Sequence, residues 1–190
     1  NYKPNKADWL EGSWAGLEKK GAEKPFTVTG LPKSFLKDIG KKITEVPSEF
    51  DINRKVLRQF QKRNKNISEE TGIDWATAEL LAFATLLNQG ISVRLSGQDC
   101  GRGTFSQRHA IIIDQKNEEK YSTLNSIVNE GSRIEIVDSP LSEAAVLGFE
   151  YGYTLADPKT LVLWEAQFGD FANGAQLIID QFIVSGESKW

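Results

Sequence analysis

The sequence predicts an α/β fold, in which helices flank a mostly parallel sheet, preceded by a helical connector. From residue 74 onward, short and continuously apolar segments alternate with helical patterns, as in parallel sheets covered on both faces. The first 68 residues are instead rich in lysine and glutamate and hold four of the six prolines. We therefore divide the chain into a connector region, residues 1–68, and an α/β domain, residues 69–190.

Three helices are expected in the connector, at residues 8–17, 31–43 and 51–64, where apolar side chains recur at helical spacing. We expect this region to be solvated, and it carries no chemical motif. The domain then opens with a helix at residues 75–87, for which Asp74 is a good N-cap and Gly90 a suitable C-terminal glycine. This helix is apolar nearly all round, which predicts burial on most sides. Its only charge, Glu79, either pairs at a domain interface or faces a ligand site.

Four strands are expected in the domain, at residues 91–95, 110–114, 134–137 and 160–164, the second of them fully buried. Two further helices are expected at residues 142–153 and 171–184. Ligands of open parallel sheets bind at the carboxyl ends of the strands. Three polar segments fall there, at residues 97–103, 138–143 and 165–174, and we place the functional site among them.

Composition excludes several classes of function. With 39% hydrophobic and 26% charged residues, the chain resembles an ordinary globular protein. A formal net charge of -3 gives no basic surface for nucleic acid, and no apolar run is long enough for a membrane span. The single Cys100 and single His109 exclude an internal disulfide and argue against a zinc site of histidine and cysteine ligands. A reducing compartment is expected, either bacterial cytoplasm or the mitochondrial matrix.

Two stretches of the domain are highly specific. Residues 93–99 read Val-Arg-Leu-Ser-Gly-Gln-Asp, followed by Arg-Gly-Thr-Phe at 102–105 and Gln-Arg-His-Ala at 107–110. Residues 163–176 read Leu-Trp-Glu-Ala-Gln-Phe-Gly-Asp-Phe-Ala-Asn-Gly-Ala-Gln. They closely resemble the thiamine-dependent dehydrogenase component of 2-oxoglutarate dehydrogenase complexes, in its transketolase-like pyrimidine-binding domain. The resemblance is dense over residues 74–190, although many relatives have histidine in the place of Gln107.

The resemblance implies oxidative decarboxylation of 2-oxoglutarate on thiamine diphosphate, with transfer of the succinyl group to a lipoyl-bearing dihydrolipoyl succinyltransferase. It also implies a homodimer. The family's Gly-Asp-Gly metal motif is absent, so magnesium is expected to be held by residues outside this chain. A related activity on 2-oxoadipate, or a non-oxidative decarboxylase, remains open. The chain ends within a structured pattern, which suggests a piece of a longer protein; alone, it would be a catalytically silent, dimerising module.

The resemblance assigns Glu143 as the carboxylic acid that exchanges a proton with N1′ of the cofactor's aminopyrimidine ring. Glu143 follows a strand and a short turn at the start of a helix, where a carboxylate is favoured by the helix dipole. From spacing alone it could equally be an acid that opens a helix. By the same resemblance, Leu141 contacts the cofactor, or else it is a core leucine.

The aminopyrimidine also needs an aromatic partner. Phe171, six residues after Glu165, has the spacing of the family's stacking phenylalanine; Phe168 is the alternative, and both could be core residues. Gln98 and Asp99 are expected near the polar edge of the ring or as turn residues. Further, Arg102 and Arg108 are expected to pair with carboxylates at a subunit interface, and His109 to be structural.

Overall fold

Three parallel strands form the central sheet of the computed structural model, which describes residues 12–17, 28–169 and 172–189. The middle strand is β1 (Val93–Gly97), between β4 (Ile134–Asp138) and β5 (Leu161–Glu165). In the strand register, Gly97 pairs with Asp138 on one side and with Glu165 on the other. All three strands therefore end at the same edge, and the expected parallel sheet is confirmed.

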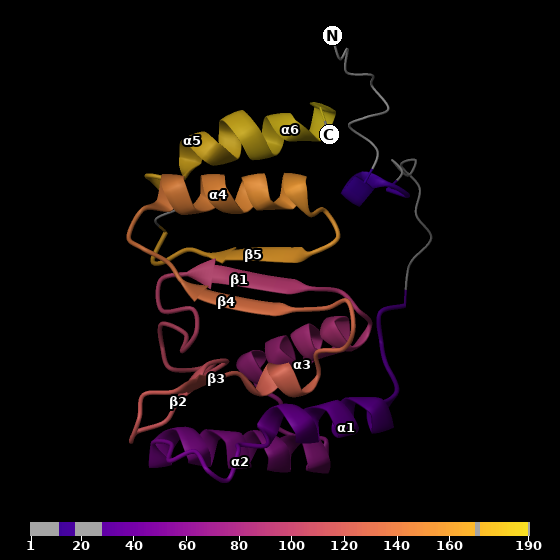
Figure 1. Ribbon diagram of the computed structural model, residues 1–190, viewed down its shortest axis with the longest axis vertical. Coiled ribbons are helices and arrows are strands. Elements are labelled where there is room, and N and C mark those ends of the chain that lie inside the picture. Colours follow the sequence, from indigo (N-terminus) through magenta and orange to yellow (C-terminus); the bar gives the residue numbers. More distant parts are fainter. Residues whose placement is uncertain (1–11, 18–27, 170–171, 190) are drawn as a thin grey trace.

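Helices cover both faces of this sheet (Figure 1). On one face lies α3 (Trp75–Asn88), with α1 (Lys33–Thr44) and α2 (Arg54–Glu69) beyond it. On the other face lies α4 (Glu143–Ala156), covered by α5 (Gln176–Ile178), a π-helical stretch (Ile179–Val184) and α6 (Ser185–Lys189). The closing helix thus begins later than residue 171 and continues past 184. Among the described residues, no helix is both long and apolar enough to cross a membrane.

The start of α3 follows the local rules read from the sequence. The Asp74 carboxylate accepts a hydrogen bond from the Thr77 backbone N–H at 2.8 Å, and Gly90 adopts a positive φ of 81° just beyond the helix. Leu80 and Leu87 of α3 are buried in the main core together with Ile39 of α1. The expectation of a solvated connector is therefore wrong for α1, because its apolar face packs onto the domain. The boundary at residue 68 stays a prediction.

Residues 110–114 do not form a buried strand of the parallel sheet. Instead, β2 (Ile112–Ile113) pairs antiparallel with β3 (Lys120–Tyr121). Ala110 packs into the main core and Ile112 into a smaller core with Phe60, whereas Ile113 is 44% exposed. This apolar run thus contributes to two cores without joining the parallel sheet. Its composition alone did not distinguish such packing from a buried strand.

The other expected helices of the connector differ mainly in their bounds. The helix expected at residues 51–64 begins after its N-cap Asn53 and continues to Glu69. Of the helix expected at residues 8–17, residues 8–11 lie outside the described part. Gly12–Trp14 form one 3-10 turn. The Trp14 indole Nε1 donates to the Leu155 carbonyl at 2.7 Å, which ties this turn to the C-terminal end of α4.

Candidate functional site

A narrow crevice lies where the three parallel strands end. Its lining comes from the segments that follow β1, β4 and β5, including Gln98, Glu143, Glu165 and Gln167. The three polar segments singled out in the sequence therefore do meet at one edge of the sheet. The enclosed volume is only about 10 Å³, about the space of one water molecule. The crevice therefore has no room for a group much larger than a water molecule.

Glu143 is the first residue of α4, directly after Ser142, and its side chain is half-buried in the crevice lining. Gly174 lies against it: a Cβ at position 174 would be 2.8 Å from Glu143 Oε2. The glycine therefore leaves room for the carboxylate, and sequence reasoning missed this contact. A glycine in a polar loop after a strand was the available signal.

Hydrogen bonds hold the three segments together. The Ser139 N–H donates to the Gly97 carbonyl at 2.9 Å, and the Gly101 N–H donates to Asp138 Oδ1 at 2.8 Å. The Gln167 amide Nε2 donates both to the Gln98 carbonyl at 3.0 Å and to Thr104 Oγ1 at 2.9 Å. Gln167 was not singled out in the sequence, although it lies inside the expected 165–174 segment.

Close approach of two strands explains the glycine at the end of β1. Gly97 has a φ of +152°, and a Cβ there would lie 2.4 Å from the Glu165 carbonyl oxygen. Any side chain would force β1 and β5 apart at the crevice.

The remaining predicted site residues fall into different environments. Leu141 is 78% exposed and Phe168 is 84% exposed, so neither is a core residue. The Phe168 ring packs edge-on against Phe105, with centroids 6.4 Å apart. Asp99 is exposed and pairs with Arg102 Nη2 at 2.9 Å. Phe171 lies outside the described residues.

The charged residues Glu79 and Arg108 pair with each other inside this chain, Arg108 Nε donating to Glu79 Oε2 at 2.6 Å. Arg108 also binds Glu165, so both of its carboxylate partners lie within this chain. His109 is half-buried. Burial first, and then the charges of Arg63 and Arg102, lower the pKa of His109.

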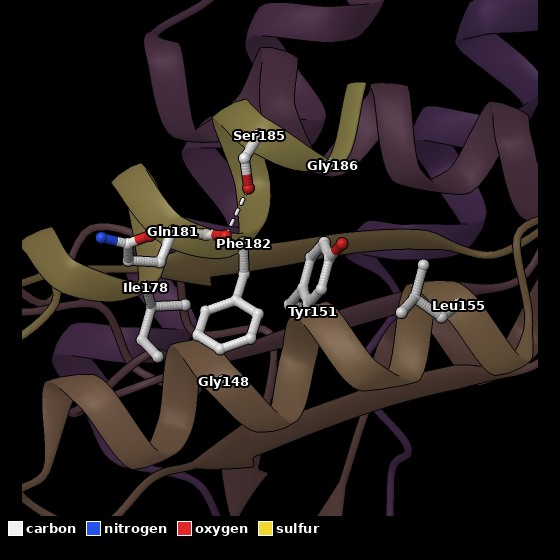
Figure 2. A pocket seen from close by; sticks show the side chains of 8 residues that line it. All are labelled: Gly148, Tyr151, Leu155, Ile178, Gln181, Phe182, Ser185 and Gly186. Carbon is white, nitrogen blue, oxygen red and sulfur yellow. Dashed lines mark hydrogen bonds between the residues drawn. The ribbon is translucent and has the colours of Figure 1, made fainter. Parts of the chain in front are cut away.

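A cavity of about 520 Å³ lies elsewhere, between α4 and the C-terminal helical run (Figure 2). Figure 2 shows the rings of Tyr151 and Phe182 side by side in its lining, tilted to one another with centroids 6.2 Å apart. Its lining contains no acidic, basic or histidine side chain.

A parallel sheet with a carboxylate in the crevice at its carboxyl edge is typical of open α/β domains, a class in which ligands bind at that edge. Residues 71–190 match the sequence family described as transketolase, pyrimidine binding domain. The chain belongs to this family.

Proteins named 2-oxoglutarate dehydrogenase E1 component from Brucella anthropi and from Brucella ovis are each 55% identical to this chain over 192 aligned residues. Both alignments cover the whole of this chain but only 19% of the relative. The chain thus spans a small part of the length of these relatives.

Proposed function

We propose that this chain is the pyrimidine-binding part of a 2-oxoglutarate dehydrogenase E1 component that uses thiamine diphosphate. The whole protein would oxidatively decarboxylate 2-oxoglutarate and pass the succinyl group to a lipoyl-bearing dihydrolipoyl succinyltransferase. The observation that carries the proposal is Glu143, a half-buried carboxylate at the start of α4, in the crevice where three parallel strands end. The identity with two bacterial proteins of that name supports the substrate and favours the bacterial cytoplasm.

The residues present fit the aminopyrimidine ring of this cofactor. Glu143 offers a carboxyl group and Gln98 amide groups for the polar edge of a heteroaromatic ring. Gly174 keeps the space beside the carboxylate open. Because the crevice is too small to enclose a ring, a second surface must cover its other side. We propose that this surface belongs to another subunit of a homodimer, and that it also holds magnesium and the diphosphate.

Bound thiamine diphosphate would supply a thiazolium carbon that accepts the electrons released by decarboxylation. The role of Glu143 is to hold and return a proton at ring N1′. Partial burial of Glu143 would strengthen its hydrogen bond to the ring. Phe171 or Phe168 would stack on the ring, and Leu141 would contact it from the turn before α4. Asp99 would lie at the ring's polar edge beside Gln98.

The proposal is tested by Glu143→Gln in the full-length protein. The amide keeps the shape of the side chain but does not transfer the proton, so exchange of the cofactor C2 proton with deuterium should slow at least about a hundredfold. Exposed Glu130 provides the control, and Glu130→Gln should exchange at the wild-type rate. Exchange that is unaffected by Glu143→Gln, measured by NMR after acid quench, would remove Glu143 from the mechanism.

A further inference from the structure

Arg108 is buried next to Glu165, a residue of the crevice lining, and every one of its donors is engaged. Its side chain is 3% exposed, and a guanidinium has five N–H groups. Nε and Nη2 donate to the two oxygens of Glu79, at 2.6 and 3.2 Å. Nη1 donates to the Cys100 carbonyl at 2.7 Å and to Glu165 Oε1 at 3.2 Å, and Nη2 also donates to Glu165 Oε2. Glu165 is thus held by two bonds in a fork.

The position of Glu165 makes this fork consequential. Glu165 ends β5, and it lines the same crevice as Glu143, so two acidic residues adjoin one small space. Burial by itself lowers the pKa of Arg108, but the hydrogen bonds to Glu79 and Glu165 outweigh it and raise that pKa. The cation is therefore permanent, and it binds both oxygens of Glu165 as well as both oxygens of Glu79 in α3.

Another largely buried arginine, on β1, provides a comparison. Arg94 of β1 is 11% exposed and also binds two carboxylates, Glu135 at 2.5 Å and Glu150 at 2.7 Å. Its ion pairs join β1, β4 and the body of α4, and it lines a different cavity from the crevice. The two clusters share their chemistry and differ in position.

We infer that Arg108 is a positioning residue that withholds the Glu165 carboxylate from the crevice, so that Glu143 alone exchanges a proton there. This inference rests on the proposed function. A released Glu165 would place a second negative charge beside Glu143 and compete for the donors of the bound ring. Removing Arg108 should therefore harm proton exchange through Glu165, and removing the Glu165 charge as well should restore it.

The experiment uses four variants of the full-length protein: Arg108→Met, Glu165→Gln, the double variant, and the control Arg94→Met. C2 proton exchange is measured at saturating thiamine diphosphate and magnesium, below the unfolding temperature of each variant. We expect Arg108→Met to slow exchange about tenfold and Glu165→Gln less than about threefold. The double variant should recover to within about threefold of Glu165→Gln, whereas Arg94→Met should lose stability but exchange within about twofold of wild type.

Recovery in the double variant is the result that a merely structural role would not produce. A double variant as slow as Arg108→Met, or an equal loss of exchange in Arg94→Met, would overturn the inference. If Arg108→Met does not fold, Arg108→Lys replaces it, since a lysine has three donors and does not hold both oxygens of Glu165 together with its other partners; the same recovery is required. Wild-type protein that binds no thiamine diphosphate, or that exchanges independently of Glu143, would instead refute the proposed function.

Discussion

At the scale of single residues, the loops at the carboxyl edge contain unusual backbone conformations. Asp99, Ser106, His109 and Phe168 have φ values of 56°, 54°, 48° and 45°, a region that side chains other than glycine seldom adopt. The Phe168 ring is 84% exposed, so burial of the ring does not offset the free-energy cost of this backbone conformation. Such conformations are often retained at ligand sites, which supports a binding role for this loop.

Stacking on the aminopyrimidine can be assigned by comparing two alanine variants of the full-length protein. We expect Phe171→Ala to raise the dissociation constant for thiamine diphosphate about fivefold, since an offset aromatic stack contributes on the order of 1 kcal/mol. Phe168→Ala should have a smaller effect, and exposed Phe149 of α4 supplies a control without effect. Calorimetric titration measures all three constants. A larger loss for Phe168→Ala would transfer the stacking role to that residue.

Cys100 predicts a dependence of stability on alkaline pH. Burial, followed by the charge of Asp138, raises the pKa of this thiol to about 12, against about 8.5 in an unfolded chain. The stabilisation is complete below the unfolded pKa and is lost as pH rises toward the folded pKa, because only the unfolded thiol then releases its proton. Urea unfolding between about pH 8 and 11 should show a steeper decline for wild type than for Cys100→Ala. Parallel curves would contradict this assignment.

At the scale of elements, local chemistry was the most reliable guide. The cap at Asp74, the glycine after α3 and three of the four expected strands were predicted within a few residues, since each depends on neighbours in sequence. The prediction of a sheet strand at residues 110–114 was wrong, because strand pairing depends on distant partners that an apolar run does not reveal. The sequence predicted that Arg108 pairs with carboxylates but not which ones, since its partners Glu79 and Glu165 lie 29 and 57 positions away.

The contribution of the α3 cap can be measured directly. Asp74→Ala removes the acceptor of the Thr77 N–H and should lower the free energy of unfolding by about 1 kcal/mol. Asp74→Asn retains a side-chain oxygen in the same place and should lose much less. Denaturant titration of the two variants separates them, and equal losses would show that the charge of Asp74 matters more than its hydrogen bond.

At the scale of the whole molecule, the layers place every described part of the site on one edge. Helices on both faces bury the sheet, while the segments that follow β1, β4 and β5 remain at the surface. The sequence predicted this edge because alternation of strands and helices implies it. It did not predict that α1 would share the core with α3, since helical periodicity says which face is apolar but not what that face covers.

A chain that carries only one side of the proposed cofactor site should bind thiamine diphosphate weakly. We expect the isolated chain to give no measurable heat with thiamine diphosphate and magnesium in a calorimetric titration, since a crevice of about 10 Å³ buries little of the cofactor. The full-length protein titrated under the same conditions is the control. Clear binding by the isolated chain would mean that its own residues hold the diphosphate.

The strand order β4-β1-β5 has a practical consequence. Within the described residues, the outer sides of β4 and β5 have no neighbouring strand, so each presents a row of backbone amides and carbonyls without ladder partners. Purified alone at high concentration, the polypeptide should therefore tend toward edge-to-edge aggregation. Keeping the polypeptide dilute, or fusing it to a solubilising protein, should reduce this aggregation.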